Sequence, residues 1–508
     1  MGSGRRTKKS RAAGAAPREI ELKLEAEPLA IDRLLAHPLI KAAGAGRRAR
    51  LHAIYYDTPD ETLRRAGISL RTRREGRRWI QTIKADRDSG ALALDRSEWE
   101  TPVKGEALNL DAAAGTALEA HLHDGIGPLL RPAFTVTSER RTHVLEREGA
   151  TVEVVLDRAE VQADGRSTAF GEVEIEIKHG SAAPLFGLAL ELAEAVPLRL
   201  SLTTKSARGY ALGQTEPQKP VKAQPVTFVR GTTSAATFQA IARSCLAQAV
   251  RNEALLRSTR DPGALHQMRV GLRRLRAAIS LFKDMMEDPQ SEAIRGELRT
   301  VSHQLGALRD LDVFIGRLEE GDPALVEARE RRERAYDGML ETLDTPRLCS
   351  LTLRVAAWIE AGDWLEADDA DLRHARDQRI ERRAQKQLGR RWKRVLKRMK
   401  HLADLEPEAR HRVRIEIKKL RYGAEFFQSL FPGTKDSRKA ILAGLESLQE
   451  TLGELNDIAV GGGMLGEGAM PEEGGAAEAE AAEERTAALL AHAWADAKRL
   501  AEVEPFWE

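Results

Sequence analysis

The chain has 508 residues, of which 42% are hydrophobic and 31% are charged, a length that predicts roughly two to four domains rather than one core. Its 80 Lys and Arg residues nearly balance its 78 Asp and Glu residues, so the places where each sign gathers matter more than the net charge of +2. The two cysteines, Cys245 and Cys349, lie far apart without metal-ligand spacing, which argues against a disulfide framework or a zinc site and indicates a reducing compartment. No run of about 18 apolar residues is present, so we expect no membrane span.

The first segment, residues 1–17, is basic and rich in small residues but lacks the apolar stretch of a secretory signal, so we expect a disordered tail. Strand signals then dominate residues 18–212. Residues 18–25 read REIELKLE, and in a strand their charged side chains share one face while the aliphatic side chains share the other. Residues 171–178, GEVEIEIK, repeat this pattern. Between the two, we expect a helix over residues 30–43 and a turn at residues 57–59.

Other strands of this segment carry charged side chains with the same period of two. Residues 68–84 predict a hairpin with basic positions on both strands. The period-two charged positions are Arg71, Arg73, Lys84, Arg96, Glu98, Glu100, Glu153, Asp157, Glu172, Glu174 and Glu176, and Arg140 and Arg141 add basic side chains. A single strand of this kind usually has its charged face exposed to solvent. About six such strands together favour a sheet that closes into a barrel with the charged side chains inside. A dry lumen lined by both signs would be very costly to leave empty, so we predict a polyanion bound with divalent cations and metal-assisted phosphoryl transfer.

The motifs of residues 18–212 resemble those of the CYTH family, also called triphosphate tunnel metalloenzymes. EIELK matches the ExExK signature, and LRTR, QTIK, RSEWE, EVEIEIK and TKSARGY extend the match in order. The resemblance implies an antiparallel eight-stranded β tunnel barrel that hydrolyses or cyclises triphosphates with Mg²⁺ or Mn²⁺.

The resemblance also implies a role for each charged position. The implied metal ligands are Glu19, Glu21, Glu98, Glu100, Glu174 and Glu176. The implied substrate-binding side chains are Lys23, Arg71, Arg73, Lys84, Arg96, Arg140 and Lys205, of which Lys23, Arg71, Arg73 and Lys84 are also expected to be catalytic. Arg96 fits either as a phosphate ligand or as an ion-pair partner of neighbouring carboxylates. None of the expected charges is missing, so we expect an active enzyme.

A linker is predicted over residues 213–235, which contain three prolines. Helical periodicity follows over residues 238–258, 263–286, 291–320, 323–343 and 346–361, and then a similar series begins again. The sequence around His266 aligns with the sequence around His411, and LGALRDLDV from Leu305 aligns with LGELNDIAV from Leu452. We therefore predict an all-α domain over residues 236–508 made of two related bundles, about 236–362 and 376–508.

Each repeat places a histidine and several basic residues along one stripe of a helix. A single basic stripe is usually a solvated face, but the repetition favours a polyanion ligand. The candidate binding residues are His266, Arg269, Arg273, Arg274, Arg276, Arg390, Arg394, Lys397, His411, Arg414, Lys418, Lys419 and Arg421. Aromatic residues make up only 5% of the chain and are not interleaved with these stripes, so base stacking is unsupported and polyphosphate is preferred, although duplex binding through phosphates stays open.

The second half resembles the CHAD family, a helical domain commonly fused behind a CYTH domain. HQMRVGLRRLR and HRVRIEIKKLR carry the match, and Arg309 with Asp310 supports it. The second repeat departs from the pattern at Asn456 and in residues 461–484, an insertion that we expect to be flexible before a terminal helix over residues 485–501. The resemblance implies two four-helix bundles that bind polyphosphate without catalysing a reaction.

Together these predictions describe a cytoplasmic, metal-dependent hydrolase of inorganic triphosphate. The helical domain would capture longer polyphosphate chains or place the enzyme on polyphosphate granules, without contact with a membrane. Hydrolysis of thiamine triphosphate, cyclisation of ATP and a polyphosphate-binding protein without catalysis remain the alternatives.

Overall fold

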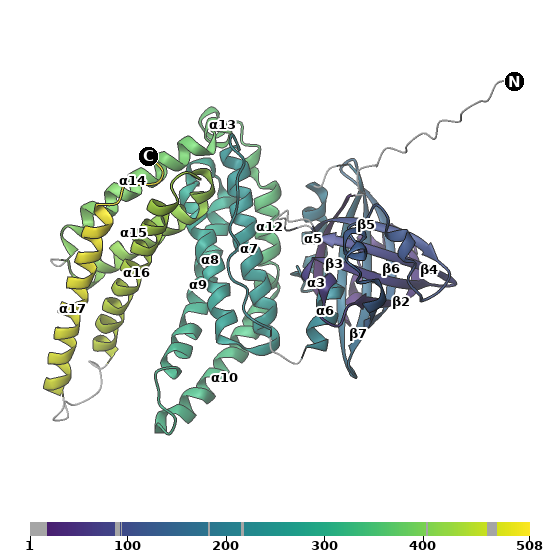
Figure 1. The fold of residues 1–508 in the computed structure, drawn as a ribbon, viewed down its shortest axis with the longest axis horizontal. Helices are drawn as coiled ribbons and strands as arrows, with labels where there is room; N and C mark the ends of the chain where they lie inside the picture. The colour runs from purple at the N-terminus through teal and green to yellow at the C-terminus, as the bar shows by residue number, and fades with distance from the viewer. Residues whose placement is uncertain are drawn as a thin grey trace. The chain divides into compact units, whose positions relative to one another are not determined.

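The computed structural model describes residues 18–86, 92, 94–180, 183–214, 218–402, 405–464 and 475–508. The chain divides into two compact units. The first unit comprises Met1–Val221, Leu246–Arg269 and His303–Ala361, and the second comprises Lys222–Cys245, Val270–Ser302 and Gly362–Glu508. The labelled strands in Figure 1 all belong to the first unit.

Eight strands of the first unit close into an antiparallel ring, as predicted (Figure 1). They are β1 (Arg18–Ala26), β2 (Arg47–Asp57), β3 (Ile68–Glu75), β4 (Arg78–Asp86), β5 (Leu94–Val103), β6 (Arg131–Arg147), β7 (Ala150–Ala163) and β8 (Arg166–His179). Their order is β5-β4-β3-β2-β6-β7-β8-β1, and the ring closes because β1 also pairs with β5. The two-residue strand β9 (Arg199–Leu200) pairs with the end of β1. Among the described residues, the sheet is thus the predicted barrel with one short additional strand.

Tight turns fix the register of the longest strands. The β6–β7 turn has Glu148 and Gly149 at positive φ, and the β7–β8 turn has Asp164 and Gly165 at positive φ. Two consecutive residues at positive φ are typical of the hairpin turn whose twist matches that of the strands. The register places Arg140 opposite Asp157 on neighbouring strands.

One part of the barrel interior is apolar. Helix α6 (Lys205–Gly213) packs against β6, β7 and β8. The resulting cluster, which we call the plug, consists of Ala53, Tyr55, Phe134, Val136, Ala159, Val161, Ala163, Phe170 and Tyr210. Phe170 lies on the same face of β8 as Glu172 and Glu174, because strand side chains alternate. The interior therefore changes from apolar to charged along its strands.

A second apolar cluster covers the other face of β2, β3 and β4. It includes Ile54, Tyr56, Leu70 and Ile83 from these strands. The cluster also takes residues from α3 (Thr62–Arg65) and from the connection between β5 and β6, which holds η1 (Leu110–Ala113), α4 (Glu119–His123) and η2 (Gly127–Leu129). Burial on both faces explains why the adjacent Tyr55 and Tyr56 are both buried.

The helix predicted over residues 30–43 is divided in two. Helix α1 (Ala30–Leu35) ends before His37, whose side chain accepts a hydrogen bond from the backbone of Leu39 and caps α2 (Pro38–Ala42). Proline lacks an N–H group and clashes with the preceding turn, so the helix cannot continue through Pro38. Helix α5 (Ala183–Ala195) follows the barrel strands.

The rest of the chain is helical, as predicted. The helices are α7 (Ser234–Thr259), α8 (Pro262–Leu281), η3 (Lys283–Met285), α9 (Pro289–Ile315), α10 (Pro323–Leu343), α11 (Pro346–Cys349), α12 (Leu351–Ala361), η4 (Asp363–Leu365), α13 (Ala370–Asp377), α14 (Ile380–Met399), α15 (Pro407–Phe427), η6 (Gln428–Leu430), α16 (Lys435–Met464) and α17 (Gly475–Ala501). Five of them begin with proline, whose missing N–H group costs nothing at the first helical position. The repeated motifs lie on α8 with α9 and on α15 with α16. Within the described ranges, no helix is both long and apolar enough to cross a membrane.

The prediction of a flexible insertion over residues 461–484 is wrong at both ends. Helix α16 continues to Met464, and α17 begins at Gly475. Residues 476–484 at the start of α17 are all Ala or Glu, which favour helix, whereas α16 ends in Gly461, Gly462, Gly463 and Met464, so helix propensity does not explain its extension. Residues 465–474 lie outside the described part of the chain.

Candidate functional site

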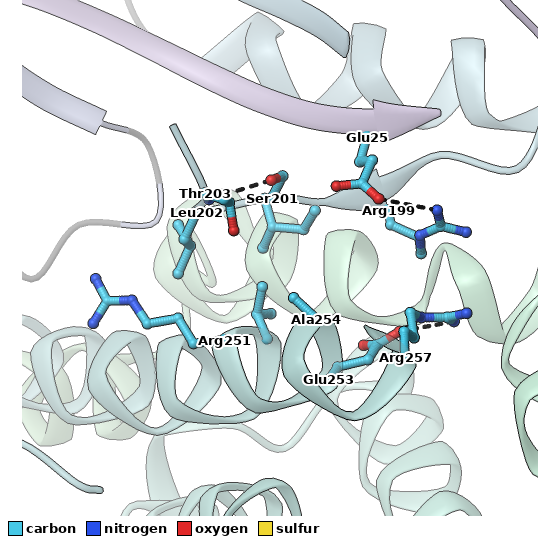
Figure 2. A pocket seen from close by; sticks show the side chains of 11 residues that line it. Glu25, Arg199, Ser201, Leu202, Thr203, Arg251, Glu253, Ala254 and Arg257 are labelled. Carbon is cyan, nitrogen blue, oxygen red and sulfur yellow. Dashed lines mark hydrogen bonds and ion pairs between the residues drawn. The ribbon is translucent and has the colours of Figure 1, made fainter. Parts of the chain in front are cut away.

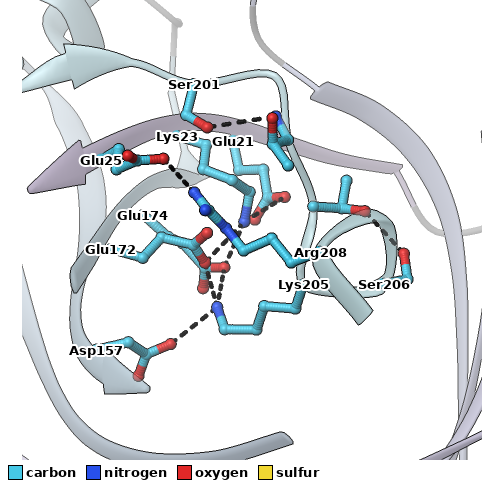
Figure 3. Close-up of polar contacts among 12 residues, drawn as sticks. Glu21, Lys23, Glu25, Asp157, Glu172, Glu174, Ser201, Lys205, Ser206 and Arg208 are labelled. Carbon is cyan, nitrogen blue, oxygen red and sulfur yellow. Dashed lines mark hydrogen bonds and ion pairs between the residues drawn. The ribbon is translucent and has the colours of Figure 1, made fainter. Parts of the chain in front are cut away.

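Two buried lysines share two carboxylates inside the barrel (Figure 3). Lys23 Nζ on β1 lies 3.2 Å from Glu172 Oε1 and 2.5 Å from Glu174 Oε1. Lys205 Nζ, in the first turn of α6, lies 2.9 Å from Glu174 Oε1 and 3.0 Å from Asp157 Oδ2, and it also contacts Glu172. The lysines thus reach the same carboxylates from a strand and from a helix.

Arg140 on β6 completes this group. Its Nε and Nη2 atoms lie 2.9 and 2.5 Å from the two carboxylate oxygens of Asp157, and Nη2 also lies 3.1 Å from Glu174 Oε2. Glu21 Oε1 lies 3.6 Å from Lys23 Nζ. We call this group the central cluster: Glu21, Lys23, Arg140, Asp157, Glu172, Glu174 and Lys205. The strand register produces it, because Arg140, Asp157 and Glu172 lie opposite one another on successive strands.

The two glutamates of the cluster have opposite pKa shifts. Burial raises the pKa of Glu172 above its usual value, against the effect of Lys205 and Lys23. Burial also opposes ionisation of Glu174, but Lys205, Lys23 and Arg140 together hold its pKa well below the usual range. The pKa of Lys23 is raised well above its usual value, because Glu172, Glu174 and Glu21 outweigh the effect of burial. Lys23 is therefore a permanent cation of the site.

Further charges come from β3, β4 and β5. Arg73 Nη2 lies 3.1 Å from Glu100 Oε1, and Lys84 Nζ lies 3.2 Å from Glu98 Oε2. Arg71 Nη1 donates a hydrogen bond to the hydroxyl of Tyr55 at 3.1 Å. The Nε atoms of Arg71 and Arg73 are buried, and neither has a hydrogen-bond partner among the residues that the structure describes. A buried N–H group without an acceptor is costly, so oxygen atoms of an anionic ligand fit here.

The predicted metal ligands fall into several groups. Glu21 and Glu174 belong to the central cluster, and Glu98 and Glu100 pair with the cations described above. Glu176 pairs with Lys178 at 2.6 Å. The side chains of Glu19 and Arg96 lie outside the described part of the chain, although β1 and β5 pair these residues.

Two acidic residues of the cluster were not among the predicted ligands. Asp157 and Glu172 both occupy period-two positions on their strands, and this signal could have identified them. One carboxylate oxygen from each of Asp157, Glu172 and Glu174 lies within 4.8 Å of the others. The second oxygen of Glu172, Oε2, is buried without a hydrogen-bond partner among the described residues. Carboxylate oxygens at this spacing fit a hard divalent cation, which would compete with the lysines for them.

A small pocket lies beside Glu25 at the end of β1, within the first unit (Figure 2). Its volume is about 30 Å³, and it is lined by residues of β1, β9, the segment after β9, and α7. Arg199 pairs with Glu25 at 3.2 Å and with Asp344 at 3.1 Å, while Arg257 pairs with Glu253 at 3.0 Å. The charges around this pocket are matched, so we do not count it as a ligand site.

The repeated basic stripes are half-buried against the neighbouring helix. In the first repeat, Arg269 Nη1 lies 3.4 Å from the carbonyl oxygen of Gly306 on α9. In the second, Arg414 Nε lies 3.3 Å from the carbonyl oxygen of Gln449 on α16, and a Cβ atom on Gly453 would lie 2.8 Å from Arg414 Nη2. The two arginines and two glycines hold equivalent places in the repeats, so part of the repeated motif serves helix packing.

The other candidate polyanion ligands differ in exposure. His411 Nδ1 lies 2.8 Å from Asn456 Oδ1, and Arg421 Nε lies 3.2 Å from Gln449 Oε1. Arg274 is only 5% exposed and packs over the ring of Phe426, which makes it a poor candidate for binding a large ligand. His266, Arg269, Arg273, Lys418 and Lys419 are half-buried, while Arg276, Arg390, Arg394 and Lys397 are exposed.

An exposed basic groove lies between α14 and α15 in the second unit. Its volume is about 720 Å³. Its lining residues are Lys393, Arg394, Lys397, Arg398, His401, Leu405, Ala409, Arg412 and Val413. We call it the α14–α15 groove. It contains two of the predicted polyphosphate ligands, Arg394 and Lys397, and none of its lining residues in the described part of the chain is acidic, although Arg394 also lies 3.5 Å from Glu416 Oε2.

Comparison with known proteins identifies the two halves of the chain. The family model of the CYTH domain matches residues 17–210, and that of the CHAD domain matches residues 240–466. The inorganic triphosphatase of Haemophilus influenzae is 26% identical over 166 residues, which are 31% of this chain and 45% of that enzyme. An uncharacterized protein of Mycobacterium tuberculosis is 28% identical over 358 residues, 64% of each chain. The chain therefore spans less than two thirds of either relative.

Among solved structures, the CHAD domain of the plant Ricinus communis is 28% identical, covering 56% of this chain and 98% of that one with a TM-score of 0.45. The family matches fall on the two regions that the strand pattern and the helical repeat define. The chain is a fusion of a CYTH domain with a CHAD domain.

Proposed function

We propose that the CYTH domain hydrolyses inorganic triphosphate with a divalent cation, Mg²⁺ or Mn²⁺, and that the CHAD domain binds polyphosphate. The observation that carries the first part is the meeting of buried cations and buried carboxylates inside one ring of strands. A phosphate chain satisfies the cations and a metal ion satisfies the carboxylates, whereas a purely anionic or purely cationic ligand would leave one set buried without compensation. The inorganic triphosphatase among the relatives supports this choice of substrate.

The basic side chains of the site bind and orient the substrate. Arg71 and Arg73 offer guanidinium N–H groups from β3, and an arginine fork matches the oxygens of a phosphate group. Lys23 and Lys205 approach from β1 and α6. These cations hold the triphosphate from several directions. This aligns its phosphoryl group with an attacking water molecule and offsets the negative charge that develops on the phosphoryl oxygens.

The acidic residues Glu21, Asp157, Glu172 and Glu174 would hold the divalent cation. That cation supplies charge neutralisation at the phosphoryl oxygens and lowers the pKa of water. A carboxylate of this group that does not contact the cation would act as the base and accept the proton of the attacking water molecule. Glu98 and Glu100 lie two residues apart on one face of β5, and they would hold a second cation in place of Lys84 and Arg73, with which they are paired.

Product analysis tests this proposal. The purified protein is incubated with tripolyphosphate, ATP, thiamine triphosphate or long-chain polyphosphate, each with Mg²⁺ and with Mn²⁺, and phosphate, pyrophosphate and cyclic AMP are measured. We expect phosphate release from tripolyphosphate that stops when the metal is chelated. Cyclic AMP from ATP, or cleavage of thiamine triphosphate alone, would assign the tunnel to the alternative activity.

A substitution in the cluster locates the activity. Glu174→Gln keeps the shape of a side chain that contacts Lys23, Lys205 and Arg140, and we expect turnover to fall on the order of 100-fold or more. Glu146→Gln is the matched control, because Glu146 is exposed on β6 and accepts a hydrogen bond from Thr151. Equal turnover of the two variants would show that the reaction takes place elsewhere.

The second part of the proposal rests on the α14–α15 groove. Six Lys, Arg and His side chains line it, with no acidic residue among the lining residues that the structure describes, and a long polyanion gains from contacts with many such charges. We propose that this binding captures long chains or places the enzyme on polyphosphate granules in the cytoplasm.

A further inference from the structure

Glu25 is a half-buried acidic residue to which the proposed reaction assigns no role. It lies two residues after Lys23 on the same face of β1, opposite Glu172 of β8. One of its carboxylate oxygens contacts Arg208 of α6 (Figure 3), and the other lies 3.2 Å from Arg199 Nη2 on β9. Burial opposes ionisation of Glu25, but Arg208 and Arg199 lower its pKa below the usual value. The ionised carboxylate therefore ties β1 to both β9 and α6.

Arg208 anchors the helix that carries Lys205. It follows Lys205 by three residues, about one turn of α6, so the two side chains lie on the same side of the helix. Its guanidinium group also packs over the ring of Phe170 on β8, 4.5 Å from the ring centre. A shift of Arg208 would therefore move Lys205 relative to the carboxylates that it contacts.

Arg199 extends this connection to two helices of the first unit. Its Nη1 atom lies 3.1 Å from Asp344 Oδ1 at the C-terminal end of α10, while its Nη2 atom holds Glu25. Arg257 Nη1 on α7 lies 2.9 Å from the same oxygen of Asp344, and Arg257 also pairs with Glu253 (Figure 2). A guanidinium group can bind two carboxylates at once, because it has five N–H groups. A continuous series of ion pairs thus runs from α7 and α10 to α6 within one compact unit.

Burial distinguishes this series from ordinary surface ion pairs. The side chains of Arg199, Arg208 and Arg257 are each 17% exposed. The Nε atom of Arg208 is buried and has no hydrogen-bond partner among the described residues. Exposed pairs contribute little because their side chains are mobile, whereas a largely buried network holds its members in one arrangement.

We propose that Arg199 and Glu25 are positioning residues that tie α6 to α7 and α10 and thereby hold Lys205 against the carboxylates of the central cluster. This inference rests on the proposed function. Arg257 and Asp344 both lie in the region that the CHAD family model matches. That region then has a second role, support of the tunnel site, which is separate from polyphosphate binding.

Asp344→Asn tests this connection from its far end on α10. We expect kcat/KM for tripolyphosphate to fall about two- to thirtyfold, the usual range for a mutation along a coupled network, because Arg199 loses one of its two carboxylate partners. Asp337→Asn is the matched control, since Asp337 is also exposed on α10 and pairs with Arg260. It should keep the wild-type kcat/KM. Both variants should have a Tm within a few degrees of the wild type, because an exposed carboxylate contributes little to stability.

A double-mutant cycle distinguishes positioning from a general loosening of the fold. Glu25→Gln keeps the shape of the side chain and should lower kcat/KM by a similar factor. If Asp344 acts through Glu25, Asp344→Asn should cause no further loss in a protein that already carries Glu25→Gln, whereas independent effects multiply.

The outcomes separate the inference from the proposed function. An active wild type with an unchanged kcat/KM in Asp344→Asn would overturn the inference, and so would losses that multiply in the folded double variant. A wild type inactive on every triphosphate would overturn the proposed function itself.

Discussion

Lys205 is a buried cation whose removal would leave carboxylates without compensation. It contacts Asp157 and Glu172, which are fully buried, and Glu174, whose side chain is 13% exposed. We expect Lys205→Met to lower the free energy of unfolding by about 3–5 kcal/mol, the usual cost of removing one partner from a buried ion pair. Added Mg²⁺ or Mn²⁺ should restore part of this loss, because a divalent cation can take the place of the ammonium group.

Chemical denaturation with and without the metal measures this effect. Lys178→Met is the control, since Lys178 is 41% exposed and pairs with Glu176 and Glu153 near the surface. Its removal should change the stability by about 1 kcal/mol or less. A Lys205→Met protein that is as stable as the wild type in the absence of metal would show that the carboxylates do not depend on this cation.

His143 gives the protein a pH-dependent stability outside the candidate site. The ring is 3% exposed, and a Cβ atom on Gly46 would lie 2.5 Å from it. Burial, helped by Arg141, lowers the pKa of His143 below its usual value of 6.5. As the pH falls, His143 therefore binds a proton in the unfolded chain before it does so in the folded protein. The stability that the neutral ring provides is complete above about pH 6.5 and is lost as the pH falls through the pKa of His143 in the folded protein.

Measuring Tm between roughly pH 5 and 8, the range in which a histidine titrates, tests whether His143 causes the pH dependence. His143→Phe keeps a flat ring that cannot be protonated, and we expect its Tm to fall less steeply toward acidic pH. His123→Phe should keep the wild-type profile, because the His123 side chain is 77% exposed. Identical profiles for the wild type and His143→Phe would assign the pH dependence to other groups.

At the scale of elements, helix α6 links the plug to the central cluster. It carries Lys205 at its start and Gly209 and Tyr210 further along. A Cβ atom on Gly209 would lie 2.1 Å from the ring of Phe134, so Gly209→Ala must displace the helix or the ring. We expect a loss of about 1–3 kcal/mol in stability, the usual cost of overpacking, and lower turnover because Lys205 moves with the helix.

The same helix provides the comparison. A Cβ atom on Gly213 would lie 3.5 Å from Asp164 Oδ2, an ordinary contact distance. Gly213→Ala should therefore retain wild-type stability and turnover, or gain slightly in stability from helix propensity. If the two alanine variants have the same Tm and the same turnover, α6 does not depend on close contact with Phe134.

The strand pattern predicted the barrel well because the face on which a strand side chain lies depends only on its position along that strand. The alternation in residues 18–25 and 171–178 decides which side chains share a face, and β1 and β8 pair so that Lys23 lies opposite Glu174. The plug could not be predicted in this way, since Tyr55, Phe134 and Tyr210 are far apart in sequence and meet only after the ring has closed. Likewise, a helical period shows which residues share a stripe but not which neighbouring helix covers it, as Arg269 illustrates.

At the scale of the whole molecule, the near balance of charges conceals two kinds of cationic site. In the CYTH domain, Lys23 and Lys205 of the central cluster are buried, Arg140 is half-buried, and all three are paired with carboxylates, so salt in the solvent screens them little. In the CHAD domain, the α14–α15 groove presents exposed cations to solvent. Binding there should weaken steeply as salt rises, whereas the short-range contacts inside the barrel should be less sensitive.

The two sites should therefore be separable by mutation. Reversing the charge at Lys397 and Arg412, which are exposed on α14 and α15 in the groove, should weaken binding of long-chain polyphosphate on the order of 100-fold and flatten its salt dependence, while turnover of tripolyphosphate stays at the wild-type value. The same double reversal at Arg331 and Arg334, exposed on α10, changes the net charge equally and should leave both properties intact.

Fluorescence anisotropy with labelled polyphosphate and a phosphate-release assay measure the two quantities. Equal losses of polyphosphate binding in the two double variants would mean that net charge, and not the groove, attracts the chain, and a parallel loss of turnover in the groove variant would mean that the two domains act as one site.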